Sequence, residues 1–490
     1  MPRPPAARLS KSRFCSGLQC PKQLWWRVHE PEAPELAAGP ALQALFARGR
    51  RVGELARQRF PGGVLVGGDH RQADGWLDET RRALAGGASA IFEAAFFEDG
   101  VFVAVDVLER RRRGFVLSEV KSTLDVKPEH LPDVAVQLHV LRRAGLEVRR
   151  AEVMHLDRDC RFPDLGNLFA REDVTREVER LLPSIPRDVR RLLRVVAGPL
   201  PDAEIGPRCT TPYECPFMDR CWPELPEHHV STLYKIGARA DALVEAGFET
   251  IRELPEDIAL PVIAARQARS VRTGRIVVEE GLAGALAEIQ PPIAFLDFET
   301  VMPAVPVWNG CHPYEQVPVQ MSCHVAHARG RVEHHDFLAE GPGDPRPAIA
   351  AAVVRACRGA RSVVAYNAGF EKRCLDHLAS NLPGQRRVLA GIGRRLVDLL
   401  PMVRDHVYHP GFGGHFGLKD VAPALVRGLG YADLEIGEGG TAQTVLEALL
   451  LDEGSFSAGE RSRLRRQLRA YCRRDTRALV ELHRKLRALA

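Results

Sequence analysis

The sequence predicts a mixed α/β protein with two α/β regions and a helical segment between them. Three observations support this prediction. Short β-rich runs surround a helix-like segment in the first region, a second set of apolar runs begins near residue 293, and only short helical patterns lie between the two regions. At 490 residues, the chain is long enough for about three domains. We therefore expect domains at 1–225, 226–288 and 289–490.

Composition and charge exclude several classes of protein. Hydrophobic residues make up 45% of the chain, which is ordinary for a globular protein and excludes a disordered or fibrous one. No uncharged apolar run approaches the roughly 18 residues that a membrane helix needs, and residues 1–13 lack the apolar core of a secretory signal. We expect a soluble, cytoplasmic protein without a membrane partner. The net charge of +5 is compatible with nucleic-acid binding but does not indicate it.

The first region opens with a helix and continues with strands. Apolar residues recur at helical intervals between Leu42 and Ala56. β-rich runs follow at 91–97, 101–108, 115–121 and 148–156, and residues 131–144 are helix-like. This succession favours a mixed α/β domain, which ends in a Pro/Cys-rich stretch at 209–222.

Charged residues gather on these expected strands. Asp106 interrupts an apolar strand, and alternation puts Glu119 and Lys121 on one face of the next strand, where a hairpin can bring them beside Asp106. Mg²⁺ held by two carboxylates, with the lysine orienting a water or the scissile phosphate, is phosphodiester-hydrolysis chemistry. Glu93 is a further candidate ligand, and Gln137 on the following helix can reach the same pocket. The alternative is a salt bridge on a half-exposed sheet.

Five of the eleven cysteines lie near the two ends of the first region. They are Cys15, Cys20, Cys209, Cys215 and Cys221. Four thiolates could hold Zn²⁺ or be unligated, although the five-residue gaps in the trio are wider than the usual zinc-ribbon spacing. The remaining six cysteines lie in segments typical of a core, and we expect them to be buried and inert.

The pattern of Asp106, Glu119-Val-Lys121 and Gln137-Leu-His resembles the RecB-type PD-(D/E)XK nucleases. It is most similar to the CRISPR-associated, iron–sulfur-bearing RecB-like exonucleases. The resemblance implies catalytic roles for these residues, in an N-terminal nuclease domain. Some relatives carry a metal-binding histidine on an early helix, whereas residues 49–60 contain none here.

The same resemblance implies a [4Fe–4S] cluster bound by one N-terminal and three C-terminal cysteines. Cys20 matches the first position, and Cys209, Cys215 and Cys221 match the other three. Such a cluster would tie together the two ends of the nuclease domain. Cys15 is the competing candidate for the first position, because it lies only five residues before Cys20.

The third region opens with the apolar strand 293–299. β-rich runs follow at 317–326, 332–338 and 362–366, and a helix closes the chain near 470–489. Asp297 and Glu299 share one face of the first strand, Glu371 lies where an apolar strand runs into a helix, and Tyr471 and Asp475 are one turn apart on the closing helix. Such converging carboxylates can hold two metal ions about 4 Å apart.

This ordered set resembles the DnaQ-like DEDD 3′–5′ exonucleases of RNase H-like fold. The resemblance implies that Asp297, Glu299 and Asp475 bind Mg²⁺ or Mn²⁺, and that Tyr471 orients or deprotonates the attacking water. The second motif of the family normally supplies aspartate, and Glu371 is one methylene longer. The alternative is a degenerate fold without activity.

Residues 9–20, 295–300 and 417–424 together resemble an uncharacterised bacterial family that fuses these two nuclease modules. The resemblance covers nearly the whole chain. Between the modules, residues 233–251 are similar to a helix–hairpin–helix element, although its usual Gly-x-Gly turn is absent and a plain helical connector is an equal alternative.

The sequence therefore predicts a metal-dependent nuclease that acts on DNA, single-stranded or with frayed ends, with Mg²⁺ or Mn²⁺ in both sites. Two alternatives stay open. One is a non-catalytic nucleic-acid-binding protein. The other is a single active nuclease fused to a degenerate domain, and here Glu371 makes the C-terminal domain the weaker candidate for activity. RNA stays open as a substrate, because no base-reading motif is visible.

Overall fold

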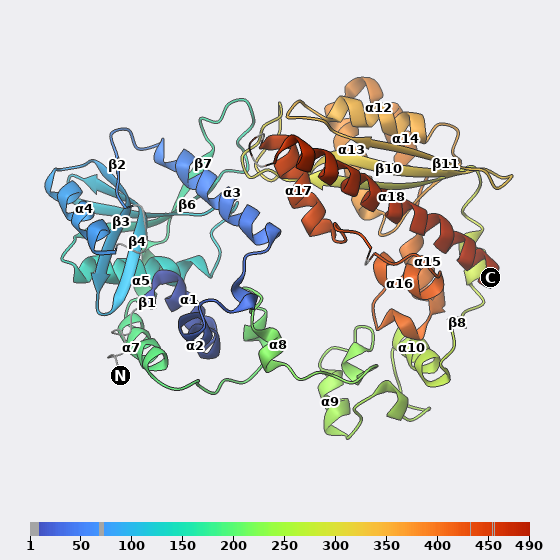
Figure 1. Ribbon diagram of the computed structural model, residues 1–490, viewed down its shortest axis with the longest axis horizontal. Coiled ribbons are helices and arrows are strands. Elements are labelled where there is room, and N and C mark those ends of the chain that lie inside the picture. Colours follow the sequence, from blue (N-terminus) through green and yellow to red (C-terminus); the bar gives the residue numbers. More distant parts are fainter. Residues whose placement is uncertain (1–8, 68–72, 432, 453, 455) are drawn as a thin grey trace. The chain divides into compact units, whose positions relative to one another are not determined.

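The computed structural model describes residues 9–67, 73–431, 433–452, 454 and 456–490, which form a mixed α/β protein (Figure 1). The chain divides into two compact units. Unit 1 comprises the described residues up to Pro223 together with Pro303–Glu315, and unit 2 comprises Glu224–Met302 and Gln316–Ala490. Residues 303–315, which lie between two strands of unit 2 in the sequence, therefore belong to unit 1.

A single mixed sheet organises unit 1. Its strand order among the described residues is β2 (Val64–Leu65), β3 (Ala90–Glu98), β4 (Val101–Arg111), β5 (Gly114–Val120), β6 (Val148–Leu156) and β7 (Phe169–Asp173), with β1 (Leu9–Ser10) parallel to β4. The neighbours from β3 to β5 are antiparallel, and β5 and β6 are parallel. The four strands expected in this region are confirmed.

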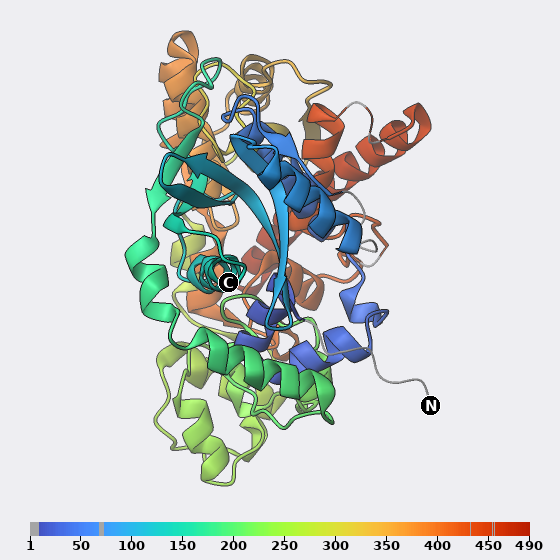
Figure 2. The same ribbon diagram turned by 90° about the vertical axis from the view of Figure 1, so that its left-hand side faces the viewer.

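Helices cover the sheet of unit 1. The helix α5 (His130–Arg143) connects the parallel strands β5 and β6, and Figure 2 shows it end-on beside the sheet. Phe14 of α1 (Lys11–Gln19), Leu24 of α2 (Pro21–His29) and Leu192 of α7 (Ile185–Ala197) join α5 in one buried core. The remaining helices of the unit are α3 (Pro40–Arg57), α4 (Ala73–Ala85), α6 (Thr175–Leu181) and α8 (Met218–Cys221).

The expected helix at 42–56 is α3, but its apolar face is only partly buried. Val52 and Ala56 are buried, whereas Leu42, Leu45 and Phe46 are exposed. The helical period was therefore informative about secondary structure, but burial extends over the C-terminal half of the helix alone.

The sheet of unit 2 has five strands in the described residues. Their order is β11 (Val332–Leu338), β10 (Val317–Ala326), β9 (Ile293–Val301), β12 (Ser362–Ala365) and β13 (Leu396–Asp398). β10 is antiparallel to both its neighbours, whereas β12 is parallel to β9 and to β13. The four expected strands are confirmed, and the three-residue β13 is too short to give an alternating pattern.

Alternation along β9 divides its residues between two helical layers. Ala294, Leu296 and Phe298 pack against α12 (Arg346–Ala356), α13 (Gly369–Asn381) and α14 (Arg386–Gly393). Phe295 and the two acidic residues lie on the other face, which α18 (Ala458–Leu489) crosses (Figure 1). The helix α17 (Gly439–Leu451) also packs beside β9. The two β9 carboxylates are thus presented toward the closing helix.

Residues 226–288, expected as a helical connector, contain short helices joined by loops and contribute to the core of unit 2. They contain α9 (Arg239–Glu245), α10 (Val262–Thr273), β8 (Val277–Val278) and α11 (Leu282–Leu286). Val230 and Leu282 share a core with Tyr408 and Phe412. β8 pairs with β14 (Val407–Tyr408), near α15 (Leu399–His406) and α16 (Leu418–Leu425).

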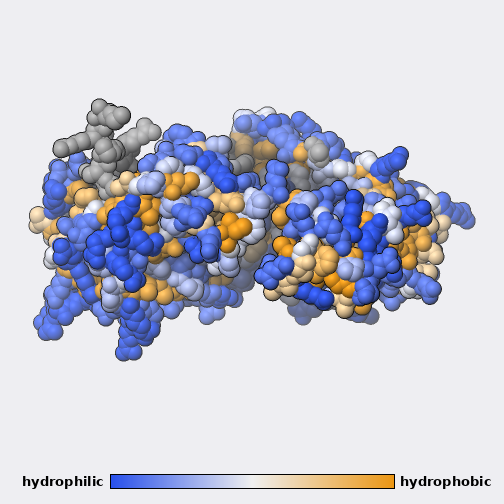
Figure 3. Space-filling model, turned by 90° about the horizontal axis from the view of Figure 1, so that it is seen from below, coloured by the Kyte–Doolittle hydropathy of each residue, from blue (hydrophilic) through white to orange (hydrophobic). Residues whose placement is uncertain are grey.

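No helix in the described residues is long and apolar enough to cross a membrane. The face in Figure 3 carries hydrophilic residues with scattered hydrophobic ones.

Candidate functional sites

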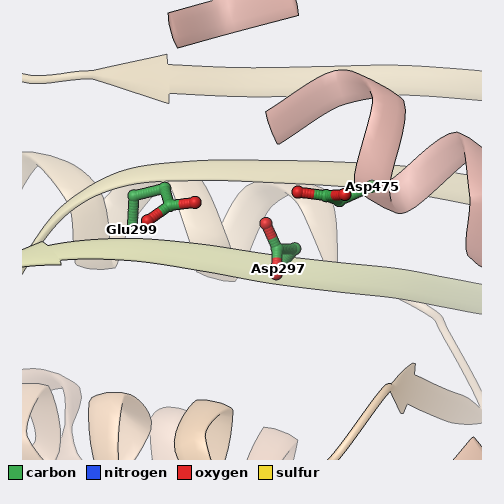
Figure 4. Close-up of side chains that lie close together, drawn as sticks. All are labelled: Asp297, Glu299 and Asp475. Carbon is green, nitrogen blue, oxygen red and sulfur yellow. The ribbon is translucent and has the colours of Figure 1, made fainter. Parts of the chain in front are cut away.

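Three carboxylates converge where β9 meets α18 (Figure 4). Asp297 and Glu299 come from β9, and Asp475 comes from α18. One ligand oxygen of each lies within 4.8 Å of the others, and among the described residues this is the only such group of three potential metal ligands. We call these three residues the acidic centre.

Burial makes the negative charge of the acidic centre costly. Burial, followed by the charges of Asp475 and Glu299, raises the pKa of Asp297 well above its usual range. Burial likewise raises the pKa of Glu299 to about 8 and that of Asp475 to about 6, because a desolvated carboxylate is less stable than the neutral acid. A divalent cation bound to these oxygens would offset that cost.

Glu371 lies in the first turn of α13 and adds a fourth acid. Its side chain is buried, and burial raises its pKa to about 8. Its charge also raises the pKa of Asp297 and of Glu299. Within the described part of the chain, its Oε2 atom has no hydrogen-bond partner. Glu371 therefore brings an unpaired buried oxygen into the electrostatic neighbourhood of the acidic centre.

Asp398 fixes the junction from which Glu371 projects. Its Oδ1 accepts hydrogen bonds from the backbone N–H of Asn367 at 2.9 Å and of Leu400 at 3.0 Å. These bonds tie the segment before α13 to the first turn of α15.

Tyr471 and two residues that the sequence did not single out complete this site. Lys419 Nζ lies 3.0 Å from the Tyr471 hydroxyl oxygen, which accepts its hydrogen bond, and Tyr431 donates to Asp475 Oδ1 at 2.6 Å. The Lys419 charge lowers the pKa of both Glu299 and Asp475. Lys419 lies in the segment 417–424, whose resemblance to a family was the available signal, whereas no pattern marked Tyr431.

A buried cysteine also touches the acidic centre. Cys472 Sγ lies 3.2 Å from Asp297 Oδ2 and donates a hydrogen bond to it. Cys472 was expected to be inert, and it is buried as expected. Burial raises the pKa of its thiol, so the thiol is neutral and serves as a donor.

In unit 1 the predicted residues around Asp106 are brought together. Lys121 Nζ bonds Glu119 Oε1 at 2.8 Å, and Gln137 Nε2 bonds Glu119 Oε2 at 2.7 Å. Asp106 Oδ2 accepts a hydrogen bond from the backbone N–H of Val120 at 2.7 Å, which fixes it beside β5.

Two further residues of this site escaped the sequence analysis. Lys11 Nζ binds both carboxylate oxygens of Glu119, at 2.8 and 2.9 Å. Asp133 Oδ2 accepts a hydrogen bond from Lys121 at 2.7 Å. Lys11 is 108 residues from Glu119 in the sequence, so no local pattern links them. We call Lys11, Asp106, Glu119, Lys121, Asp133 and Gln137 the lysine–carboxylate cluster.

Lys11 and Lys121 affect the pKa of Glu119 more strongly than that of Asp106. Burial alone would raise the pKa of Glu119, but the charges of Lys11 and Lys121 hold it well below its usual range. The same two lysines also lower the pKa of Asp106, but burial and the Glu119 charge outweigh them and raise it to about 7.

Glu93 is only partly buried and acts on this cluster electrostatically. Its charge raises the pKa of Asp106, and its carboxylate lies 3.9 Å from Arg57 Nη1. Its backbone has φ of 58° in the middle of β3, and its carbonyl oxygen accepts a hydrogen bond from Trp76 Nε1 at 2.7 Å. A positive φ at a non-glycine residue marks local strain that its surroundings sustain.

The four predicted cluster cysteines lie close enough for their charges to act on one another. Cys20, Cys209 and Cys215 are buried and Cys221 is partly exposed. Burial raises the pKa of Cys215, and the charges of the other three raise it further. Two hydrogen bonds from Gln19 Nε2, to the carbonyls of residues 208 and 213, link the first helix to the cysteine trio. We call these four cysteines the cysteine quartet.

The distances between the four sulfur atoms can be compared with those that a single Zn²⁺ ion requires. Tetrahedral Zn²⁺ with Zn–S bonds of about 2.3 Å requires sulfur atoms roughly 3.8 Å apart. Among the described residues, however, no three cysteine sulfurs lie within 4.8 Å of one another. Within the described residues, the four thiols as placed therefore do not form the closed arrangement of a single-ion site.

Cys15 belongs to a different neighbourhood. Burial raises the pKa of its thiol to about 12, and the charges that act on it are those of Asp133, Lys121, Lys11 and Glu119. It therefore lies beside the lysine–carboxylate cluster, and Cys20 is the N-terminal member of the quartet.

Comparison with known proteins adds one match. A family model described as a domain of unknown function, DUF2779, matches residues 294–417. The matched range includes Asp297, Glu299 and Glu371 and ends before Lys419, Tyr471 and Asp475. No curated protein is significantly similar to the chain.

Proposed function

We propose that the protein is a metal-dependent nuclease that hydrolyses phosphodiester bonds, with the acidic centre of unit 2 as its principal catalytic site. The observation that carries the proposal is the convergence of three carboxylates from β9 and α18, with ligand oxygens within 4.8 Å of one another. The mixed sheet that holds these residues between two helical layers supports an RNase H-like fold for unit 2. The proposed substrate is DNA, single-stranded or with frayed ends.

The donor set fits Mg²⁺ or Mn²⁺. Carboxylate oxygens are the ligands that these ions prefer, and Asp297, Glu299 and Asp475 would hold the ion. The unpaired Oε2 atom of Glu371 is a further candidate ligand. When bound, such ions supply an activated water and charge stabilisation at the leaving oxygen.

Tyr471 orients the attacking water in this proposal. Burial and the charge of Asp475 raise the pKa of its phenol well above its usual range, so the hydroxyl is protonated at neutral pH. Lys419 donates a hydrogen bond to the phenol oxygen, and the phenol hydroxyl itself hydrogen-bonds to Asp475, so the phenol is fixed beside the acidic centre. Of the two roles expected for Tyr471, a neutral phenol supports orientation and not deprotonation.

The lysine–carboxylate cluster is the proposed second nuclease site, in a RecB-like PD-(D/E)XK domain. Its support is the assembly of Asp106, Glu119, Lys121 and Gln137 on neighbouring elements. Because Lys11 engages both oxygens of Glu119, a divalent ion there would have to displace that lysine. This competition makes unit 1 the weaker candidate for activity.

We also propose that the cysteine quartet binds a [4Fe–4S] cluster. The support for this assignment is the proximity of the four thiols, since the charges of the other three each raise the pKa of Cys215. The cluster would be structural, because it would join the N-terminal helices to residues 209–221.

The rival function is nucleic-acid binding without catalysis. In that case the buried carboxylates would be protonated and paired with one another, and no metal would be needed. Their raised pKa values permit either state at neutral pH, so only an activity measurement separates the two functions.

Degradation of end-labelled single-stranded DNA and RNA in Mn²⁺, by anaerobically purified protein, tests the proposal. We expect Asp297→Asn to abolish the products of one site and Asp106→Asn those of the other. Asp376→Asn is the matched control, because Asp376 is an exposed acid on α13 that pairs with Lys372. Wild-type protein with its cluster loaded that cleaves neither polymer would overturn the nuclease function and favour the binding protein.

A further inference from the structure

Unit 2 carries a basic groove on its surface. A groove of about 500 Å³ lies between α18 and the strands β10 and β11. Arginines of α18 line one wall, and His324 and His334 lie on the strand side. We call it the arginine groove.

The arginines follow successive turns of α18. Arg466, Arg469, Arg473 and Arg477 are separated by three, four and four residues, so they share one side of the helix. At about 1.5 Å of rise per residue, the row is about 16 Å long. All four are exposed, and the small side chain of Ala470 lies among them. A row of this length suits an extended polyanion better than a single small anion.

The acids of unit 2 neutralise only part of this row. Arg469 pairs with Asp336, and Arg477 pairs with Glu481 at 2.8 Å. In the described residues, neither Arg466 nor Arg473 has an acidic partner or a hydrogen bond. Two guanidinium groups, about two helical turns apart, are therefore available to a ligand.

The strand side of the groove is rigidly built. His324 is 3% exposed, and its Nδ1 atom is 2.8 Å from Thr476 Oγ1. Ser322 Oγ bridges Thr476 Oγ1 at 2.7 Å and His334 Nε2 at 2.9 Å. Each imidazole is thus held through one nitrogen, and its other nitrogen makes no hydrogen bond within the described part of the chain.

The groove and the acidic centre lie on opposite flanks of α18. Tyr471 and Asp475 face β9, whereas the arginine row faces β11, the strand beyond β10. In the register of the sheet, Ser322 of β10 is opposite Asp297. A ligand in the groove is therefore distinct from the group that would react at the acidic centre.

The side chains that line the groove favour a nucleic-acid strand over an acidic peptide as its ligand. Guanidinium groups bind phosphate oxygens in a bidentate fork, and positive rows that follow a backbone are typical of single-strand binding. An acidic peptide would need apolar pockets for anchoring side chains, and among the described residues that line the groove Ala470 is the one apolar residue.

We propose that the arginine groove binds the phosphate backbone of a nucleic-acid strand, several nucleotides away from the phosphodiester at the acidic centre. The assignment of nucleic acid as ligand rests on the proposed nuclease function. Arg466 and Arg473 are its main phosphate-binding residues, and the two histidines are its floor.

A direct test is arginine footprinting with phenylglyoxal on the full chain, with and without a 30-nucleotide oligodeoxythymidylate in EDTA. We expect the oligonucleotide to protect Arg466 and Arg473 from modification at least threefold. Arg487, which is exposed on the same helix, is the internal control and should react equally in both samples. Equal modification of Arg466 and Arg473 with and without a bound oligonucleotide would overturn the proposal.

Fluorescence anisotropy with the same labelled oligonucleotide gives an independent readout. Arg466→Ala/Arg473→Ala should weaken binding about tenfold and reduce the slope of log K against log salt by about 1.4, which is the value for two lost single-strand phosphate contacts. The matched control Lys485→Ala/Arg487→Ala removes the same charge from exposed positions and should change affinity less than twofold. Equal losses in the two variants would indicate general electrostatics and overturn a specific groove.

Two further outcomes separate this inference from the proposed function. Protection of Arg466 and Arg473 without any Mn²⁺-dependent cleavage would overturn the nuclease function and retain the groove. Cleavage without protection of Arg466 and Arg473 would overturn the groove as a binding site and retain the nuclease function. Poly-glutamate that protects these arginines as well as the oligonucleotide does would overturn nucleic acid as the ligand in favour of an acidic protein.

Discussion

Without a bound metal ion, the ionised carboxyl groups of the acidic centre are destabilised by burial and by one another's charge. Glu299, with a pKa of about 8, and Asp475, with a pKa of about 6, both titrate above the values near 4 of unfolded chains. Each group holds a proton in the folded state that the unfolded state releases. Because the unfolded state then binds fewer protons, the free energy of unfolding falls as pH rises from about 4 to about 8.

The first prediction follows from that sign. In EDTA, the melting temperature should fall between pH 5.5 and pH 8. Glu299→Gln should make this fall smaller, by an amount that corresponds to on the order of 1 kcal/mol of unfolding free energy per unit of the Glu299 pKa shift. Mn²⁺ should raise the melting temperature more at pH 8 than at pH 5.5, because the ion competes with protons for the same oxygens. Differential scanning fluorimetry measures all of these changes. A melting temperature with equal pH dependence in wild type and Glu299→Gln would contradict the shifted pKa.

The second prediction concerns Lys419, which the sequence analysis did not place in the site. Its charge lowers the pKa of Glu299 and Asp475, and its Nζ atom fixes the Tyr471 hydroxyl. Lys419→Met should therefore reduce kcat/KM for DNA about tenfold and move the acidic limb of the pH profile upward, because the carboxylates then ionise at higher pH.

Lys372→Met is the matched control for that substitution. Lys372 is exposed on α13 and pairs with Asp376 at 2.8 Å, so its removal should leave the pH profile unchanged. If Lys419→Met lowers the rate without moving the profile, Lys419 acts only by positioning Tyr471.

At the scale of elements, α18 connects the sites of unit 2. Gln320 Nε2 of β10 donates to the carbonyl oxygen of Leu468 at 2.8 Å, and the Ser322–Thr476–His324 hydrogen bonds follow two turns later. These buried bonds fix the rotation of α18 about its axis. They thereby hold Tyr471 and Asp475 toward β9 and the arginine row toward β11.

The third prediction tests this anchoring. Thr476→Val keeps the side-chain shape but removes the hydroxyl, which leaves Ser322 and His324 without their partner in a buried setting. Such a loss costs about 1–3 kcal/mol of unfolding free energy. Thr444→Val on α17 is the control, because the Thr444 hydroxyl bonds only the carbonyl of Gly440 in the preceding turn, and its loss should cost less than about 0.5 kcal/mol. Urea denaturation compares the two, and equal losses would argue against the anchoring network.

The extent of α18 illustrates what the sequence could predict. The closing helix was expected near 470–489, whereas it begins at Ala458. Residues 458–469 are rich in arginine and carry only Leu464 and Leu468 as buried residues, so their apolar period is weak. The available signal was the capping box of Ser457 and Glu460, in which the two side chains satisfy each other's backbone N–H groups.

The strength of the local sequence pattern also explains which site residues could be identified from the sequence. Asp297, Glu299 and Asp475 interrupt or adjoin apolar patterns, and they lie together as expected. Lys11, Asp133 and Tyr431 reach their partners from elements distant in the sequence, and nothing in their local surroundings distinguishes them from solvated polar residues. Long-range contacts of this kind require the fold itself.

At the scale of the whole molecule, the two units are not continuous in sequence. The expected boundaries were 225 and 288, whereas residues 303–315 belong to unit 1 although β9 and β10 on either side belong to unit 2. Within unit 1, the Tyr314 hydroxyl donates to the Ser122 carbonyl, and Ala304 joins a buried cluster with Val52 and Leu156. Composition and punctuation cannot reveal such an excursion, because residues 303–315 contain the prolines and polar residues of an ordinary loop.

The cysteine quartet comes from two segments of unit 1 that are distant in the sequence, the N-terminal helices and residues 209–221. A crosslink that closes a loop of nearly 190 residues stabilises a fold mainly by restricting the unfolded chain. A cluster bound there should therefore matter more for the integrity of unit 1 than for the chemistry of either carboxylate site.

The fourth prediction follows from that role. Anaerobically purified wild-type protein should contain about four iron atoms and four acid-labile sulfides per chain. Cys20→Ser and Cys209→Ser should each lose the cluster and make residues 9–29 accessible to limited proteolysis. Cys15→Ser should keep the iron–sulfur cluster and the protection of residues 9–29 from proteolysis, because Cys15 lies among the charges of the lysine–carboxylate cluster. One zinc per chain in place of iron would contradict the proposed [4Fe–4S] cluster and favour a four-cysteine zinc site.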